Sequence, residues 1–103
     1  MLFSDIRDRK VRFTDERLHH IQNDHPEMAG QIERVIETLR NPHTIVRSKT
    51  DNDVELFYRQ YPTTPVSNKY MCVVLKAKFN DISIITAYFT DTVKKGEVLW
   101  PSR

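Results

Sequence analysis

The stretch Ile82-Ser83-Ile84-Ile85-Thr86-Ala87-Tyr88-Phe89-Thr90 is the most strand-like segment of this 103-residue chain. It contains no charged residue, glycine or proline, and it is rich in β-branched and aromatic side chains, which pack well in sheets. It therefore predicts a central strand. Because side chains alternate along a strand, one face is expected to carry Ile82, Ile84, Thr86, Tyr88 and Thr90. That face changes from isoleucines to hydroxyl groups, which makes it a candidate floor for a site.

Three further strands are predicted before this segment. They are expected over residues 44–49, 54–61 and 70–79, with turns at 50–53 and 80–81 and a loop at 62–69 that contains two prolines. Short connections favour sequential antiparallel neighbours. The strands over 70–79 and 82–90 are apolar on both faces, so they are expected in the centre of the sheet.

Two helices are predicted upstream of the strands. Thr14 is placed to cap a helix over residues 15–24, in which Leu18 and Ile21 share a face with His25. A second helix is expected over residues 26–40, because Pro26 suits a first turn. Its apolar stripe consists of Met28, Ile32, Val35, Ile36 and Leu39.

These elements predict an α+β fold for a single domain over residues 1–103. Two N-terminal helices would pack on one face of a four- to five-stranded antiparallel meander sheet, with a short edge strand over residues 11–13. Residues 1–10 are expected to form a loosely held arm, and residues 91–103 a tail with the apolar plug Val98-Leu99-Trp100. Either the tail or a second subunit is expected to cover the other face of the sheet.

Composition narrows the class of protein only moderately. The formal net charge of +2 permits contact with nucleic acid without implying it. Cys72 is the single cysteine, so no internal disulfide can form, and its apolar surroundings favour a buried thiol. No apolar run reaches the length of a membrane span, and the first residues lack a signal-peptide core. We therefore expect a cytoplasmic protein with no membrane partner.

His25 is the main candidate for acid–base chemistry. It lies at a helix junction, on the same face as buried residues, and histidine is the best general acid or base near neutral pH. The alternative is a capping or hydrogen-bonded core histidine. His19, His20 and His43 are expected at the surface.

Polar residues on the strands are candidates for substrate contact. Arg47 and Arg59 can hold a phosphate, and Tyr61 shares a face with Arg59. If the strands pair as predicted, Arg59 converges with Tyr70, Thr86 and Tyr88 on one concave patch. The alternatives are a solvated sheet face for the arginines and local hydrogen bonds for the two hydroxyl groups. Lys69 is a further substrate-binding candidate, although lysines of the strands, loop and tail are most simply solubilising charges.

Metal and cofactor sites find little support. His20 and Asp24 are four residues apart on a helix, but no third ligand follows at metal-binding spacing. The chain has only two glycines and no Gly-rich phosphate loop. We expect neither a metal nor a cofactor.

Several short motifs together resemble a known superfamily. They are His25-Pro26-Glu27, Asn41-Pro42, Tyr70-Met71-Cys72-Val73-Val74-Leu75-Lys76 and Ile84-Ile85-Thr86-Ala87-Tyr88. Over residues 11–90 the chain resembles the phage-type branch of the barnase, EndoU, colicin and RelE-like ribonucleases, which are small α+β domains of toxins and mobile elements.

The resemblance implies metal-independent cleavage of RNA, in which the ribose 2′-hydroxyl attacks to leave a 2′,3′-cyclic phosphate. It implies that His25 is the base or acid, Arg59 the electrostatic clamp, and Thr86 and Tyr88 the groups that position the phosphate. It also implies RNA as the ligand and leaves room for an antitoxin or another protein partner. No second histidine falls on the same side, so the partner acid or base is unidentified.

Two alternatives to a ribonuclease remain open. The first is a catalytically inactive module of the same fold that binds RNA or protein. The second is an interaction protein whose exposed sheet face forms a homodimer.

Overall fold

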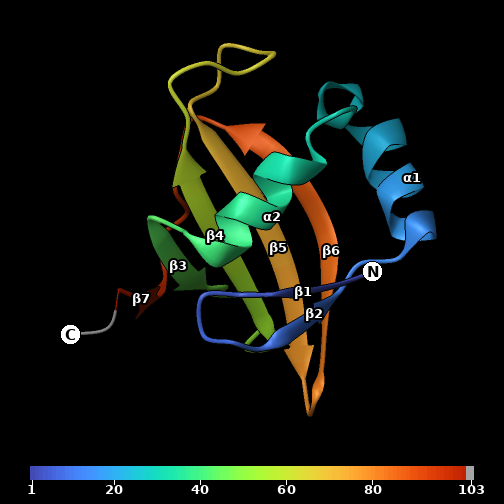
Figure 1. Cartoon of the computed structure of the whole chain (residues 1–103). Helices are drawn as coiled ribbons and strands as arrows, with labels where there is room; N and C mark the ends of the chain where they lie inside the picture. Colours follow the sequence, from blue (N-terminus) through green and yellow to red (C-terminus); the bar gives the residue numbers. More distant parts are fainter. Residues whose placement is uncertain (102–103) are drawn as a thin grey trace.

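A seven-stranded, mostly antiparallel open sheet forms the frame of the molecule, with the strand order β1-β2-β6-β5-β4-β3-β7 (Figure 1). The structure is a computed structural model that describes residues 1–101. The strands are β1 (Leu2–Ser4), β2 (Lys10–Arg12), β3 (Thr44–Arg47), β4 (Val54–Gln60), β5 (Tyr70–Lys78), β6 (Asp81–Thr90) and β7 (Glu97–Trp100). The helices are α1 (Asp15–Asp24), the short 3₁₀ helix η1 (Pro26–Met28) and α2 (Ile32–Arg40). The α+β class is therefore confirmed, with a larger and mixed sheet.

The predicted meander is present as β3-β4-β5-β6, in which each strand pairs antiparallel with the next. The additional strands come from the two ends of the chain. β1 and β2 form a hairpin that joins β6 through the parallel pair Arg12 and Ser83, and β7 pairs antiparallel with β3. The sequence did not predict β1 or β7 as strands: residues 1–10 were expected to form a loose arm because charges of both signs follow one another closely there, and Val98-Leu99-Trp100 was expected to be an apolar plug.

The first predicted helix agrees with α1, whose N-cap residue Thr14 accepts a hydrogen bond from the backbone N–H of Arg17. The second predicted helix, over residues 26–40, is wrong in its first half. The chain makes only a 3₁₀ turn after Pro26, then adopts φ +76° at Gly30 before α2 begins. Glycine tolerates this left-handed conformation, which ends a helix.

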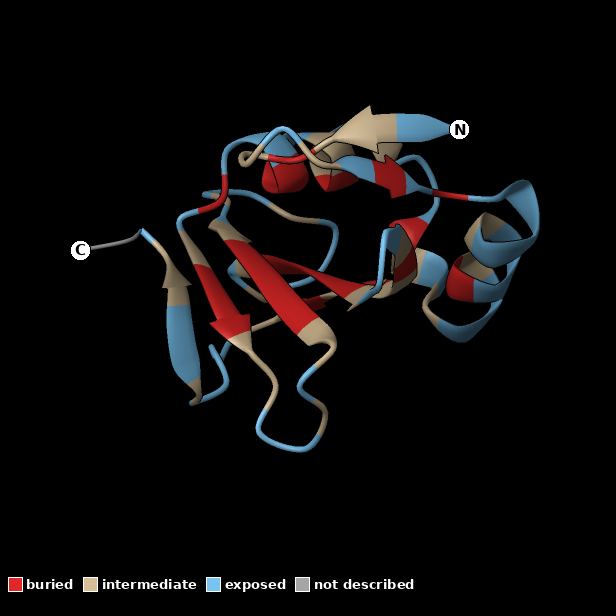
Figure 2. Cartoon of the chain, turned by 90° about the horizontal axis from the view of Figure 1, so that it is seen from below, coloured by how far each residue is buried: buried red, intermediate tan, exposed pale blue. Residues whose placement is uncertain are grey.

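The main core lies between the sheet and the elements in front of it in Figure 1, which are α2 and the β1–β2 hairpin. It is built from side chains of α1, η1, α2, the hairpin with the residue after it, and one face of the central strands. Its largest fully buried members are Phe13, Phe57, Leu39, Ile45, Met71 and Leu75. In Figure 2 the buried residues accordingly follow the middle of the central strands and the sheet-facing side of α2.

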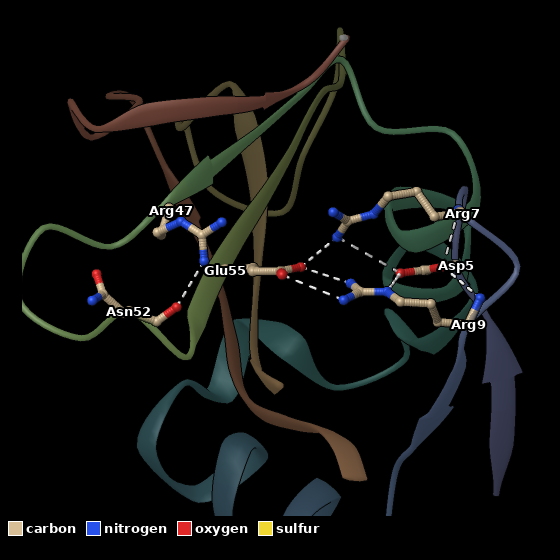
Figure 3. A network of polar contacts seen from close by, with 6 residues as sticks. All are labelled: Asp5, Arg7, Arg9, Arg47, Asn52 and Glu55. Atoms are coloured by element: carbon tan, nitrogen blue, oxygen red, sulfur yellow. Dashed lines mark hydrogen bonds and ion pairs between the residues drawn. The ribbon is translucent and has the colours of Figure 1, made fainter. Parts of the chain in front are cut away.

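Residues 1–10 are held firmly, in contrast to the loosely held arm that we expected. The Asp5 side chain is fully buried, and its carboxylate accepts a 2.8 Å hydrogen bond from Arg9. Figure 3 shows Arg7 and Arg9 both reaching the carboxylate of Glu55 on β4. Alternating charges that look solvated in the sequence thus form a network that fastens the hairpin to the sheet.

A β-bulge in β6 changes which side chains share a face. Val74 pairs with Thr86 and Leu75 pairs with Ile84, so Ile85 is the extra residue on β6. Ile84 consequently packs in the main core, while Thr86 faces the opposite side. The predicted alternation through residues 82–90 is therefore wrong, because one inserted residue reverses the facing of everything beyond it.

Candidate functional site

The side of the sheet opposite α2, which we call the open face, carries a second and smaller core. Its buried members are Val46, Leu56, Tyr58, Cys72 and Val74, and Tyr70 and Tyr88 pack against them. The segment between β6 and β7 crosses this face behind β4 in the view of Figure 1, and the backbone N–H of Lys94 donates to the Tyr58 hydroxyl at 3.1 Å. The tail therefore covers part of the open face.

A cavity of about 460 Å³ opens beside this segment, a size typical of ligand pockets. Its floor is apolar, and hydroxyl and ammonium groups surround the floor. We call it the lysine hollow; its polar lining consists of Ser48, Lys49, Thr50, Thr86, Tyr88, Lys94 and Lys95. No carboxylate lines it among residues 1–101, so the hollow favours an anionic ligand.

Gly96 allows the tail to bring its lysines to the hollow. A Cβ atom on this residue would clash with the carbonyl oxygen of Arg47 and would lie 2.7 Å from Cγ1 of Val46. Beyond Gly96, β7 pairs with β3 and anchors the segment. The close contact between tail and β3 thus places Lys94 and Lys95 at the rim.

Three ionisable groups lie in or beneath the hollow and are protonated at neutral pH. Burial raises the pKa of the Tyr88 phenol well above its usual value, and the neighbouring Cys72 raises it further. Burial likewise raises the pKa of Tyr58 to about 12 and that of the Cys72 thiol to about 11. Tyr88 can therefore donate a hydrogen bond to an anion, whereas Cys72 is not a thiolate nucleophile.

His25 lies next to this site. It follows α1, where its backbone N–H donates to the carbonyl of Ile21 at 2.7 Å. The imidazole is 35% exposed, and its ring centroid is 5.7 Å from that of Tyr88. Its Nδ1 atom is 3.6 Å from a carboxylate oxygen of Glu27. The predicted pair of His25 and Tyr88 is thus brought together, with Tyr88 also lining the hollow.

Arg59 and Tyr61 do not join this site. Arg59 pairs across the sheet with Met71, which is in the main core, so its side chain lies on the helix side. There it donates to the carbonyl of Asn41 at 2.7 Å, and Tyr61 donates to Glu37 at 2.5 Å. The predicted convergence of Arg59 with Tyr70, Thr86 and Tyr88 is therefore not formed.

The other predicted contact residues are spread over the molecule. Arg47 makes a 3.0 Å ion pair with Glu97 and donates to the carbonyl of Asn52, a bond visible in Figure 3, so it anchors β7. Lys69 is exposed in the loop directly before β5 and does not line the hollow. Tyr70 lies on the open face, with its ring edge-on to Tyr58.

The residues that sequence reasoning missed are the cations of the hollow, Lys49, Lys94 and Lys95. Single lysines carry no local signal that separates a binding role from a solubilising one. A weak signal was the glycine that follows Lys94-Lys95, since a lone glycine near a chain end can mark a close backbone approach.

No group of three or more His, Cys, Asp or Glu side chains in residues 1–101 is arranged to hold a metal ion. Within the same residues, no helix has the length and apolar character that crossing a membrane requires.

Comparison with protein-family models, characterised proteins and solved structures finds no match to this chain. The fold and the lysine hollow describe an α+β protein with a basic, hydroxyl-lined site on its open sheet face.

Proposed function

We propose that this protein is a metal-independent endoribonuclease and that the lysine hollow binds the RNA backbone. One observation carries the proposal. The His25 ring lies beside Tyr88, and Tyr88 lines the same hollow as Thr86, Lys94 and Lys95. A histidine can act as the base toward the ribose 2′-hydroxyl, and cations and hydroxyl donors can stabilise the charge that develops on the phosphate.

In the proposed reaction, His25 removes the proton of the ribose 2′-hydroxyl, and the 2′-oxygen attacks the adjacent phosphorus. The bond from phosphorus to the 5′-oxygen breaks, which leaves a 2′,3′-cyclic phosphate. The leaving 5′-oxygen takes its proton from the imidazolium of His25 or from water. Lys94 and Lys95 stabilise the negative charge of the phosphorane, while the neutral Tyr88 phenol donates to a phosphate oxygen.

The proposal differs from the family resemblance in the identity of the cation. The resemblance assigns the clamp to Arg59, which is bound to α2 on the other side of the sheet. The tail lysines take this role in our proposal. The proposal keeps the fold that the resemblance implies, in which helices pack on an antiparallel meander such as β3–β6.

The first test is cleavage of a mixed-sequence labelled RNA, with EDTA present, by the unmodified protein and by His25→Ala. We expect products with cyclic phosphate ends that disappear in the variant, with an unchanged circular dichroism spectrum. If the unmodified protein cleaves none of a broad panel of RNAs, the ribonuclease proposal is overturned, and a binding assay on the same panel decides whether the inactive RNA-binding alternative replaces it.

Two further proteins, a double lysine variant and an arginine variant, test which cation contacts the RNA phosphate. We expect Lys94→Gln combined with Lys95→Gln to weaken RNA binding and to reduce the slope of log K against log salt by about 1–2, the loss of one or two phosphate contacts. If Arg59→Gln reduces the slope instead, the assignment from the resemblance is correct and ours is wrong.

A further inference from the structure

The β5–β6 turn presents an aromatic ring to solvent. Phe79 is 94% exposed and adopts φ +56°, a conformation that is rare for a bulky residue and usual for glycine or asparagine. Lys78 and Asp81 are the last paired residues of the two strands, so Phe79 and Asn80 form the turn itself. Figure 1 shows this turn as the tip that projects beyond the sheet at the bottom of the view.

Two lysines of β5, Lys76 and Lys78, lie between this tip and the lysine hollow. Lys76 pairs across the sheet with Val54, which lines the hollow, so both face the open side. Because strand side chains alternate, Lys78 lies on the same face about 7 Å further along β5. Lys76 is 40% exposed while paired with Asp51 at 2.9 Å. Lys78 has its Nζ atom 5.8 Å from the Phe79 ring centroid.

The surroundings of Phe79 favour a nucleobase over an apolar protein surface. Its neighbours at the tip are Lys78, Asn80 and Asp81, so the ring does not belong to an apolar patch of the size that protein docking uses. Proteins that bind single-stranded nucleic acids combine a basic track for the backbone with exposed aromatic rings on which bases stack.

We infer that single-stranded RNA runs from the lysine hollow along the open face of β5 and that Phe79 stacks on a base beyond the scissile bond. This inference rests on the proposed function and specifies its substrate as a single strand. Val74 at the floor of the hollow and Lys78 at the end of β5 are four residues apart, about 14 Å of extended strand, and Phe79 follows directly in the turn. The stacked base therefore lies several nucleotides from the cleaved bond.

The test measures fluorescence anisotropy of labelled single-stranded RNA with the His25→Ala protein, in which cleavage is absent. Phe79→Asn removes the ring, and asparagine tolerates the positive φ, so the turn keeps its conformation. We expect an RNA of about 12 nucleotides to bind about 5-fold to 150-fold more weakly, the range for loss of one base stack. A dinucleotide, which is too short to reach from the hollow to the tip, should bind equally to both proteins.

Two further variants make the test specific. Phe79→Trp keeps a stacking ring and should retain tight binding of the longer RNA. Leu2→Asn removes another exposed apolar side chain, on β1, and should leave binding unchanged. Binding of the longer RNA that is insensitive to Phe79→Asn overturns this inference alone. If the His25→Ala protein binds no RNA of either length, both this inference and the proposed function are overturned.

Discussion

Tyr88 connects the two parts of the proposed site, because its ring lies beside His25 and its side chain lines the lysine hollow. Its hydroxyl group is protonated at neutral pH, since burial and the nearby Cys72 raise its pKa. The phenol is therefore suited to donating a hydrogen bond to a phosphate oxygen and unsuited to acting as a base.

We expect Tyr88→Phe to lower kcat/KM for RNA cleavage by about 100-fold, the usual cost of removing one donor to a transition-state oxyanion. The ring that packs beside His25 is kept, so thermal unfolding should change little. Tyr61→Phe, on the helix side of the sheet, is the matched variant and should leave cleavage unchanged. Equal activity of Tyr88→Phe and the unmodified protein would show that this hydroxyl does not contact the substrate.

At the scale of elements, the segment between β6 and β7 has two roles. It covers part of the open face through the bond from Lys94 to Tyr58, and it supplies two of the three lysines of the hollow. Both roles depend on the close approach of Gly96 to β3.

We expect Gly96→Ala to lower the free energy of unfolding by about 1–3 kcal/mol, because the added methyl group meets the backbone of Arg47. Cleavage should fall as well, since the displaced tail moves Lys94 and Lys95. Gly30→Ala is the comparison: within residues 1–101, no atom beyond its chain neighbours lies within 4 Å of its added Cβ, and its left-handed φ of +76° costs about 1–2 kcal/mol. Urea denaturation measures the stability of both variants, and an RNA cleavage assay measures their activity. An equal loss of cleavage in Gly96→Ala and Gly30→Ala would contradict a specific role of the tail.

At the scale of the whole molecule, a cysteine thiol and two tyrosine phenols make the folded state less stable at alkaline pH. Burial raises the pKa of Cys72 from 9.0 to about 11. It also raises the pKa of Tyr58 and of Tyr61 from 10.0 to about 12, the latter with help from the hydrogen bond to Glu37. In the unfolded chain these groups lose their protons at the lower, ordinary values, so rising pH favours the unfolded state.

We therefore expect these groups to leave the free energy of unfolding unchanged below pH 9. Between pH 9 and about 12 they should lower it. Urea denaturation at successive pH values measures the fall, and the ultraviolet absorbance of tyrosinate reports ionisation. Tyrosinate formation near pH 10 by all four tyrosines in the folded protein would contradict the raised pKa values.

The local elements could be predicted from the sequence because their signals are local. The cap at Thr14, the apolar spacing of α1 and α2, the apolar and aromatic segments of β4 and β5, and the β-branched run of β6 each identify an element without knowledge of the rest. Chemistry alone also selected His25 and Tyr88 as candidates, and their ring centroids lie 5.7 Å apart in the structure.

The sequence by itself determined an α+β domain with a β3–β6 meander, because short loops leave sequential strands few ways to pair. Only the tertiary structure decided which side chains share a face. The bulge at Ile85 separates Thr86 from Ile84, and Arg59 lies on the helix side of β4. These outcomes depend on strand register and on contacts between distant segments, including the tail that brings Lys94 to Tyr58. Contacts between distant segments produce no periodic pattern in the sequence, so Lys49, Lys94 and Lys95 could be identified as neighbours only from the folded structure.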